Sequence, residues 1–306
     1  MRPTYMNLRI DEYNLWVKDV IRWQNSNFDI NICLMDLYCL LQSEKIERVK
    51  DCSYEITNDL FSLRINNNKV NIVRQSNFPE IQELTAYLQY FYKLENNFLH
   101  EKKIDNDTTS IIINLFSEIA IILAFDVDII LVEEKRDIKK VEVIRDFISK
   151  LNSNFKANFK IPIYFLPYSF KILGLNGDME LKNNNCLLFS DSQNSLKKKI
   201  FTAKTDSDSI IRFDIRKKPE ISNLINLYQH LTNETYDKIE DKFNGKKYAD
   251  FKNALIKRSD SFLRVNYKKK ADKSVIEKIF TESYRRTNGE LKKRIKNIKK
   301  IIGISN

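Results

Sequence analysis

Residues 205–255 read TDSDSIIRFDIRKKPEISNLINLYQHLTNETYDKIEDKFNGKKYADFKNAL. The apolar residues of this stretch recur at helical spacing, which predicts helices over residues 219–231 and 234–243. Pro219 suits the first position of the first helix, and Gly245 suits the end of the second. The helical pattern continues over residues 248–270 and 273–300, so the last third of the chain is predicted to be all helical.

Upstream of this region, short apolar runs that are β-branched or aromatic alternate with helical patterns. The runs at residues 29–35, 69–73, 128–132 and 162–166 predict buried parallel strands, and residues 79–94 and 110–125 predict helices between them. Such alternation is typical of an α/β fold with a Rossmann-like doubly wound parallel sheet. The predicted domains are residues 1–200, with a helical insertion at about 79–125, and a helical, basic C-terminal domain at residues 201–306.

Positive charge is concentrated at the C-terminal end of the chain. The protein has 306 residues and a net charge of +11. From Lys252 onward there are 17 Lys and Arg against 5 Asp and Glu, so the first 251 residues are nearly neutral. Such a region can attract a polyanion, or it can be a solvated lysine-rich surface in a sequence rich in Asn, Lys and Ile. The candidate RNA-binding residues are Lys252, Lys257, Arg258, Arg264, Lys268, Lys269, Lys270, Arg285, Arg286, Lys292, Lys293 and Arg294.

Glycine is missing from the first 173 residues. Nucleotide sites in Rossmann-like folds use glycine where the backbone must approach a phosphate closely, because any Cβ there occupies ligand space. The N-terminal half therefore has no glycine-rich phosphate cradle. The chain also has no apolar run of about 18 residues and no signal-peptide pattern at its start, so we expect a cytoplasmic location and no membrane partner.

Metal ligands are not arranged in a recognisable motif. Four cysteines, at positions 33, 39, 52 and 186, lack CxxC spacing, and only two histidines accompany them. We expect free buried thiols and no metal site. Asp128, Glu133 and Lys135 form the D-x4-ExK pattern of some metal-dependent nucleases, but the gap is too short for the usual hairpin between the aspartate and the ExK strand.

Several stretches together resemble the tryptophanyl-tRNA synthetases, which are class I aminoacyl-tRNA synthetases. They are RPT at residues 2–4, VRQSNFPEIQEL at 73–84, DIILVEEKRD at 128–137, and TDS, IRFD, KP, ISNL and GKKYADFK within 205–255. The resemblance implies a nucleotide-binding domain, a helical domain that approaches the anticodon end of tRNA, and an obligate two-fold dimer. It also implies that ATP and Mg²⁺ would activate tryptophan.

The family's HIGH signature falls on Arg9, Ile10, Asp11 and Glu12 when the resemblance is anchored on Tyr13. Asp11 takes the place of the glycine that lies under adenine. Like charges about 4 Å apart near a surface repel by roughly 4 kcal/mol. An acidic, bulky side chain at this place is therefore expected to oppose the binding of ATP.

The family's KMSKS signature falls on a loop that is shorter by about two residues, at Asp178, Met179, Glu180, Leu181 and Lys182. Only Met179 matches the signature. The family's lysines stabilise the departing pyrophosphate, and charged groups of this kind contribute several kcal/mol to catalysis. Acidic neighbours such as Glu180 make this loop a poor partner for pyrophosphate.

The residues that would recognise tryptophan also differ. Ile121 falls where the family has an aspartate that accepts the indole N–H, and an unmatched buried donor costs about 1 to 3 kcal/mol. The family's GEDQ element becomes Glu133, Glu134, Lys135 and Arg136. The family's first strand is also missing unless residues 5–10 take its place.

Three hypotheses follow from the resemblance. The first is a catalytically inactive synthetase-like homodimer, without a cofactor, that binds tRNA, another RNA or a protein partner. The second is a divergent synthetase that still activates an amino acid or other carboxylate with ATP and Mg²⁺. The third is a structural partner that forms a heteromer with a true synthetase through the family's dimer surface. In the second hypothesis the residues that would contact ATP are Arg9, Lys135, Arg136 and Lys182.

Overall fold

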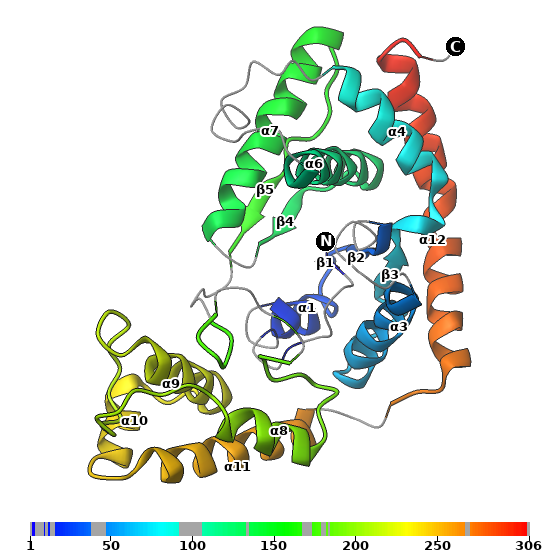
Figure 1. Cartoon of the computed structure of the whole chain (residues 1–306). Coiled ribbons are helices and arrows are strands. Elements are labelled where there is room, and N and C mark those ends of the chain that lie inside the picture. The colour runs from blue at the N-terminus through cyan, green and yellow to red at the C-terminus, as the bar shows by residue number, and fades with distance from the viewer. Residues whose placement is uncertain are drawn as a thin grey trace.

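A computed structural model describes residues 2–3, 9, 12, 16–37, 47–91, 106–132, 135–166, 173–178, 182, 184–266 and 270–304 (Figure 1). The strands are β1 (Arg2–Pro3), β2 (Ile30–Met35), β3 (Val70–Arg74), β4 (Ile129–Leu131) and β5 (Ile163–Phe165). The helices of the N-terminal part are α1 (Lys18–Trp23), α3 (Glu47–Ser62), the 3-10 helix η2 (Gln75–Asn77), α4 (Pro79–Tyr90), α6 (Asn106–Phe125) and α7 (Lys135–Phe155). The remaining helices are α8 (Gln193–Phe201), α9 (Pro219–Thr232), α10 (Tyr236–Phe243), α11 (Tyr248–Asn266) and α12 (Lys273–Ile301).

The strands form two parallel sheets. One has the order β1-β2-β3 and the other pairs β4 with β5. A doubly wound sheet has the order 3-2-1-4-5, so the two sheets are its two halves, separated between β1 and β4 in the described residues. The fold is therefore α/β and Rossmann-like, with a helical C-terminal region, as the sequence predicts.

Strands β2 and β3 lie between two apolar clusters. Cys33 and Met35 of β2 belong to one cluster with α4, α6 and α7, whereas Ile32 and Leu34 belong to the other with α1 and α3. The alternation follows from the two-residue repeat of a strand, and it buries both faces. The predicted burial of these two strands is confirmed.

The β4–β5 sheet differs from the prediction because it is largely exposed. Ile163 of β5 is 56% exposed, and Ile129 of β4 is 38% exposed. A strand needs neighbours on both edges to be buried, and within the described residues β4 and β5 pair only with each other, so each has an unpaired edge.

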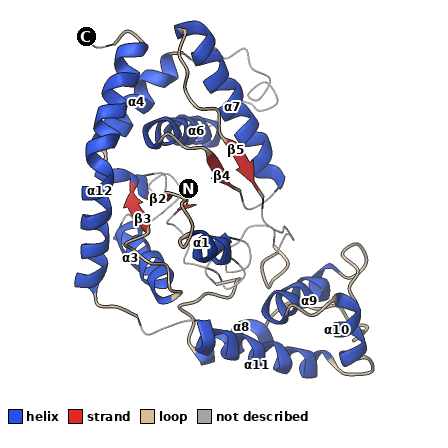
Figure 2. Ribbon diagram, turned by 180° about the vertical axis from the view of Figure 1, so that it is seen from behind, coloured by secondary structure: helices blue, strands red, loops and turns tan. Residues whose placement is uncertain are grey.

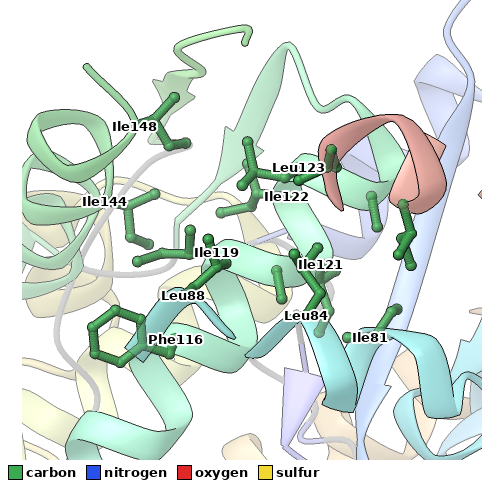
Figure 3. Packing of buried hydrophobic residues seen from close by; sticks show 14 of the residues in the cluster. Ile81, Leu84, Leu88, Phe116, Ile119, Ile121, Ile122, Leu123, Ile144 and Ile148 are labelled. Atoms are coloured by element: carbon green, nitrogen blue, oxygen red, sulfur yellow. The ribbon is translucent and has the colours of Figure 1, made fainter. Parts of the chain in front are cut away.

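Helix α6 is apolar nearly all round because helices surround it. Figure 3 shows Ile121 and Leu123 of α6 among side chains of other helices, with Leu84 of α4 beside Ile121. Ile144 and Ile148 of α7 pack on another side of α6. Among the helices of the described residues, none is long and apolar enough to cross a membrane.

Helices α8 to α11 form a separate unit with its own core, centred on Tyr228 and Phe251. Figure 2 shows this unit at one end of the molecule, whereas α12 runs along the outer edge of the sheet domain. Ile276 and Leu291 of α12 belong to the two clusters of that domain, and Ser283 Oγ accepts a hydrogen bond from the backbone N–H of Ile72 at 3.1 Å. The structure thus differs from the predicted domain of residues 201–306, because the apolar face of α12 packs on β3 and α4 instead of on α11.

Candidate functional site

Arg9 and Glu12, the two residues aligned with HIGH that the structure describes, are joined by hydrogen bonds. The carboxylate of Glu12 accepts hydrogen bonds from the backbone N–H of Arg9 at 2.7 Å and from the indole N–H of Trp16 at 3.1 Å. The backbone N–H of Glu12 in turn bonds the carbonyl of Arg9 at 3.2 Å. A glutamate that reaches back to the backbone N–H three residues earlier is half of a helix capping box. Glu12 is fully buried and Arg9 is 8% exposed, so both side chains are inside the protein.

Arg9 also connects to the segment after the shortened loop. Its backbone forms an antiparallel bridge with Leu188. The backbone N–H of Leu188 bonds Asp191 at 2.8 Å, and Asp191 forms an ion pair with Lys199 of α8 at 2.8 Å. Backbone contact therefore joins Arg9 to the segment that follows the shortened loop.

The shortened loop is bonded to itself and to α9. The backbone N–H of Lys182 donates to Asn185 Oδ1 at 2.7 Å, and Asn185 Nδ2 donates to Asn176 Oδ1 at 3.1 Å. Asn223 of α9 holds Leu173 through both of its amide atoms, at 2.8 and 2.9 Å. These amides hold the described residues on either side of the loop's centre, and that centre lies outside the described residues.

Gly174 belongs to this packing. A Cβ at Gly174 would lie 2.5 Å from Asn185 Nδ2, which is far closer than real contacts. The glycine therefore makes room for the side chain of Asn185. The described residues give it no role in binding a phosphate.

Ile121 lies in the apolar cluster around α6 and is 3% exposed. A hydrocarbon at this position offers no acceptor to an indole N–H. Lys135 and Arg136 begin α7, but their side chains are outside the described residues. Other predicted site residues also lie outside the described residues, namely Ile10, Asp11, Glu133, Glu134, Met179, Glu180, Leu181, Lys268 and Lys269.

A buried polar cluster, not predicted from the sequence, lies at the carboxyl ends of β2 and β3. Asp36 accepts hydrogen bonds from the backbone N–H of Ser76 at 3.0 Å and from its hydroxyl, and Gln75 Nε2 donates to Ser117 of α6. The carboxyl ends of strands are where doubly wound sheets bind ligands. The sequence could have predicted this cluster, because polar residues, Asp36 and Gln75, directly follow the two strands. Protein donors now bond both oxygens of the Asp36 carboxylate.

Several candidate RNA-binding residues are occupied by contacts within the protein. Lys252 is 8% exposed, and its ammonium donates to the carbonyls of Phe201 and Ala203 at 3.1 and 2.7 Å. Burial lowers the pKa of Lys252. The Lys252 ammonium therefore satisfies carbonyl groups at the C-terminal end of helix α8 and is not available to a phosphate.

On α12, three more candidate residues already have partners. Lys292 pairs with Glu80 of α4 at 3.0 Å, and Arg294 bonds the carbonyl of Phe125 at 3.0 Å. Arg286 donates to Asn71 of β3 at 2.9 Å. On α11, Arg264 pairs with Asp260 at 2.9 Å. The candidate residues with exposed side chains and no ion pair within the described residues are Lys257, Arg258, Lys270, Arg285 and Lys293.

The stretch quoted at the outset contains a charged cluster that holds the helical unit together. Lys218 is 8% exposed, and its ammonium bonds Asp206, Asp208 and the hydroxyl of Tyr248. The Lys218 ammonium holds the pKa of Asp208 well below its usual range. This cluster joins the TDS, KP and GKKY motifs, which are far apart in sequence. Their role in this structure is to fix the fold of the unit.

Tyrosine rings can stack on RNA bases, but two tyrosines of the C-terminal helices pack within the protein. The ring of Tyr236 stacks on Phe213 with centroids 3.9 Å apart, and its hydroxyl donates to Asn226 at 2.8 Å. Tyr284 packs on Phe78. Tyr267 lies outside the described residues.

The comparisons with known proteins agree with the resemblance. A sequence model of the family described as tRNA synthetases class I (W and Y) matches residues 138–264. The tryptophan–tRNA ligase of Caldanaerobacter subterraneus subsp. tengcongensis is 26% identical over 294 residues, which cover 91% of this chain and 89% of that protein. That of Malacoplasma penetrans is 34% identical over 159 residues, which cover 48% of this chain and 47% of that protein. The family model and these relatives support a place for the chain among the tryptophanyl-tRNA synthetases.

Solved structures of tryptophanyl-tRNA synthetases share the fold along almost the whole chain. The enzyme of Mycoplasma pneumoniae superimposes with a TM-score of 0.77 at 17% identity, over 99% of this chain and 96% of that chain. The Campylobacter jejuni protein, complexed with ADP and tryptophan, gives a TM-score of 0.75 at 20% identity, over 99% and 98% of the two chains. The family fold is thus retained in a chain whose sequence has diverged widely.

Metal ligands are not gathered anywhere in the described residues, where no group of three or more His, Cys, Asp or Glu side chains could hold an ion. Cys33, Cys52 and Cys186 are free and buried, as predicted, and Cys39 lies outside the described residues. Burial raises the pKa of the Cys33 thiol to about 12, so this cysteine is inert as a nucleophile at neutral pH.

Proposed function

We propose that this member of the tryptophanyl-tRNA synthetase family does not form an aminoacyl-adenylate and acts by binding RNA. The observation that carries the first half is the hydrogen bonding of Arg9 and Glu12. The Glu12 carboxylate is fully buried and accepts the backbone N–H of Arg9 and the indole N–H of Trp16. At a position that the family uses for ATP, the side chain of Glu12 is therefore occupied by hydrogen bonds within the protein.

The residues of this region do not fit ATP and Mg²⁺. A triphosphate needs donors and cations that face an open site, together with glycine where the backbone approaches it. Asp11, at the place of the family's glycine, would instead put a carboxylate beside the phosphates, where like charges repel. The first 173 residues contain no glycine, and the backbone bridge between Arg9 and Leu188 closes the region further.

Loss of the amino acid site supports the same proposal. Ile121 lies within the apolar core, where it cannot accept the indole N–H of tryptophan. The loop of residues 173–178 and 184–186, which includes Asp178, is held by asparagine amides. A loop held in this way is poorly suited to close over a departing pyrophosphate.

The second half of the proposal rests on charge. The region from Lys252 onward carries an excess of 12 positive charges, and its exposed lysines and arginines suit a phosphate backbone. The family acts on tRNA, so tRNA or a related RNA is the proposed partner. We place the protein in the cytoplasm as a homodimer, since the family is dimeric, and a heteromer with a true synthetase is the competing arrangement.

Two binding measurements test the proposal on the full chain. Addition of 5 mM ATP with Mg²⁺ and tryptophan should leave the melting temperature unchanged, because a ligand that does not bind the folded state does not stabilise it. Fluorescence anisotropy should show binding of a labelled tRNA that weakens with added salt. A rise in melting temperature with ATP would favour a divergent ligase. Light scattering on the purified chain would distinguish the homodimer from a subunit that needs a synthetase partner.

A further inference from the structure

Helix α12 carries the largest density of positive charge in the protein. Between residues 283 and 301 the sequence has eight Lys and Arg and a single acidic residue, Glu290. The helix lies at the outer edge of the molecule in both views (Figures 1 and 2). Its buried side, which includes Ser283, Leu291, Ile295 and Ile298, faces the sheet domain. The outer side of α12 is therefore fixed in place and faces solvent.

Half of these eight cations have a partner within the protein. Lys292 pairs with Glu80, Lys299 with Glu83 at 2.7 Å, and Arg294 with Glu290 at 3.4 Å. Arg286 donates to Asn71 and to the carbonyl of Asn67. These four side chains fasten α12 to α4, α6 and the start of β3, and their charge is largely committed there.

The other four cations form one stripe. Arg285, Lys293, Lys296 and Lys300 are exposed, and within the described chain none of them has an ion pair. At 3.6 residues per turn these positions fall within an arc of about 80°, and at 1.5 Å per residue they span about 22 Å. The stripe contains no carboxylate, since Glu290 lies on another side of the helix. We refer to these four residues as the α12 stripe.

We infer that the α12 stripe binds the sugar–phosphate backbone of base-paired RNA. This inference rests on the proposed RNA-binding function and assigns the surface and the class of RNA. A straight, rigid row of cations complements the regular phosphates of a duplex. Unstacked bases, in contrast, are usually held by exposed aromatic side chains. Tyr284, the aromatic residue next to the stripe, packs on Phe78 instead.

The α12 stripe does not suit a membrane surface. Helices that lie in the lipid interface insert an apolar face beside their cations. In α12 that apolar face is buried in the sheet domain, with Leu291, Ile295 and Ile298 each less than 5% exposed. In the α8–α11 unit, the candidate RNA-binding residue Lys252 is instead bonded to the carbonyls of Phe201 and Ala203.

Anisotropy with two labelled RNAs tests this assignment on the full chain. The first RNA is a 20-base-pair duplex and the second is a 20-nucleotide oligouridine. Four engaged phosphates predict that duplex affinity falls about 150-fold between 50 and 200 mM salt. The variant K293Q/K296Q/K300Q should bind the duplex on the order of a hundredfold more weakly at 100 mM salt, with a salt dependence of only about fourfold.

Matched variants show whether duplex binding depends on where the lysines lie or only on the total charge of the protein. Lys197, Lys238 and Lys247 are exposed lysines of the α8–α11 unit that are not candidate RNA-binding residues, and K197Q/K238Q/K247Q removes the same charge there. This control should bind the duplex nearly as wild type does, and K293R/K296R/K300R should restore binding because it restores the charge. All six positions are exposed, so circular dichroism should show an unchanged fold.

Three results would overturn the assignment. If the α12 variant binds the duplex as wild type does while the control variant does not, RNA binding stands but the surface is wrong. Preference for oligouridine over the duplex would show that the class of RNA is wrong. If the wild type binds neither these RNAs nor tRNA, the proposed function itself fails and the α12 stripe has no RNA partner.

Discussion

Two groups of buried polar residues can be compared, one at Arg9 and Glu12 and the other around Lys218. They differ in how closely their sequences resemble the tryptophanyl-tRNA synthetases. Lys218, Asp206 and Tyr248 belong to the motifs that still resemble tryptophanyl-tRNA synthetases, and they hold the helical unit together. Arg9 and Glu12 fall where the resemblance places the HIGH signature, and Arg9 is bonded to Glu12 and bridged to Leu188. Under the proposed function, the residues that hold the fold keep the family's motifs, whereas the residues expected to face the substrates differ from them.

Replacing Glu12 should have the largest effect on stability. Glu12→Ala leaves the backbone N–H of Arg9 and the indole N–H of Trp16 without this acceptor in a buried site, and we expect a loss of about 3 kcal/mol. Urea unfolding followed by tryptophan fluorescence measures it. Glu142→Ala, at an exposed position, is the control and should change stability by less than about 0.5 kcal/mol.

The same variant tests whether the turn is structural. If Glu12 takes part in catalysis, Glu12→Ala should keep its stability and lose an activity. If Glu12→Ala is as stable as the wild type, Glu12 does not have the structural role that we assign to it.

Removing Lys218 should destabilise the helical unit by a smaller amount. Lys218→Met leaves Asp206 and Asp208 facing each other without a cation, and Asp208 is half-exposed, so we expect a loss of about 2 kcal/mol. Hydrogen exchange should show the loss in α9 to α11 and not in β2 or β3. Lys217→Met, the exposed neighbour, is the control. Equal effects of the two variants would show that the cluster does not hold the unit together.

The contact between α12 and α4 should respond weakly to pH. Hydrogen bonds from Lys299 and then from Tyr87 lower the pKa of Glu83 below its usual value of 4.5. A carboxyl whose folded pKa is lowered stabilises the fold above the unfolded pKa, and this stability is lost as the pH falls through the folded pKa. Glu83 is 40% exposed, so we expect at most about 1 kcal/mol.

Glu83→Gln measures this contribution. The variant should be slightly less stable than the wild type at pH 7 and equal to it once the pH is well below the folded pKa of Glu83. Urea midpoints across this pH range provide the comparison. A difference that persists at the acidic end would mean that Glu83 stabilises α12 by packing and not by charge.

Local sequence patterns predicted most of the helices and strands, because side-chain periodicity and residues such as proline act over short stretches of the chain. The buried strands β2 and β3 follow from their β-branched runs, and α9 begins at Pro219 as predicted. Within the candidate site, the sequence was informative where the type of a residue alone excludes a function. Ile121 is the example, because its side chain has no atom that could accept a hydrogen bond from an indole N–H. Partners distant in sequence were not predictable. Ile72 and Ser283 meet 211 residues apart, and nothing in the α12 pattern indicates that β3 is its neighbour.

The exposed face of β4 and β5 escaped prediction for the same reason. Their apolar sequences are typical of buried strands, but burial depends on whether a neighbouring strand is present. The buried role of Lys252 was equally invisible, because a lysine in a basic stretch gives no sign that two carbonyls lie within reach of its ammonium. Burial of single polar side chains is a property of the assembled fold.

Tryptophan-dependent exchange of labelled pyrophosphate into ATP tests the central claim most directly, because it requires both substrates to bind and the adenylate to form. With the full chain, Mg²⁺, ATP and tryptophan, we predict no exchange above the level without the amino acid, and the same result with each of the other standard amino acids. Exchange that depends on tryptophan or any other amino acid would contradict the account and would identify the chain as a working ligase.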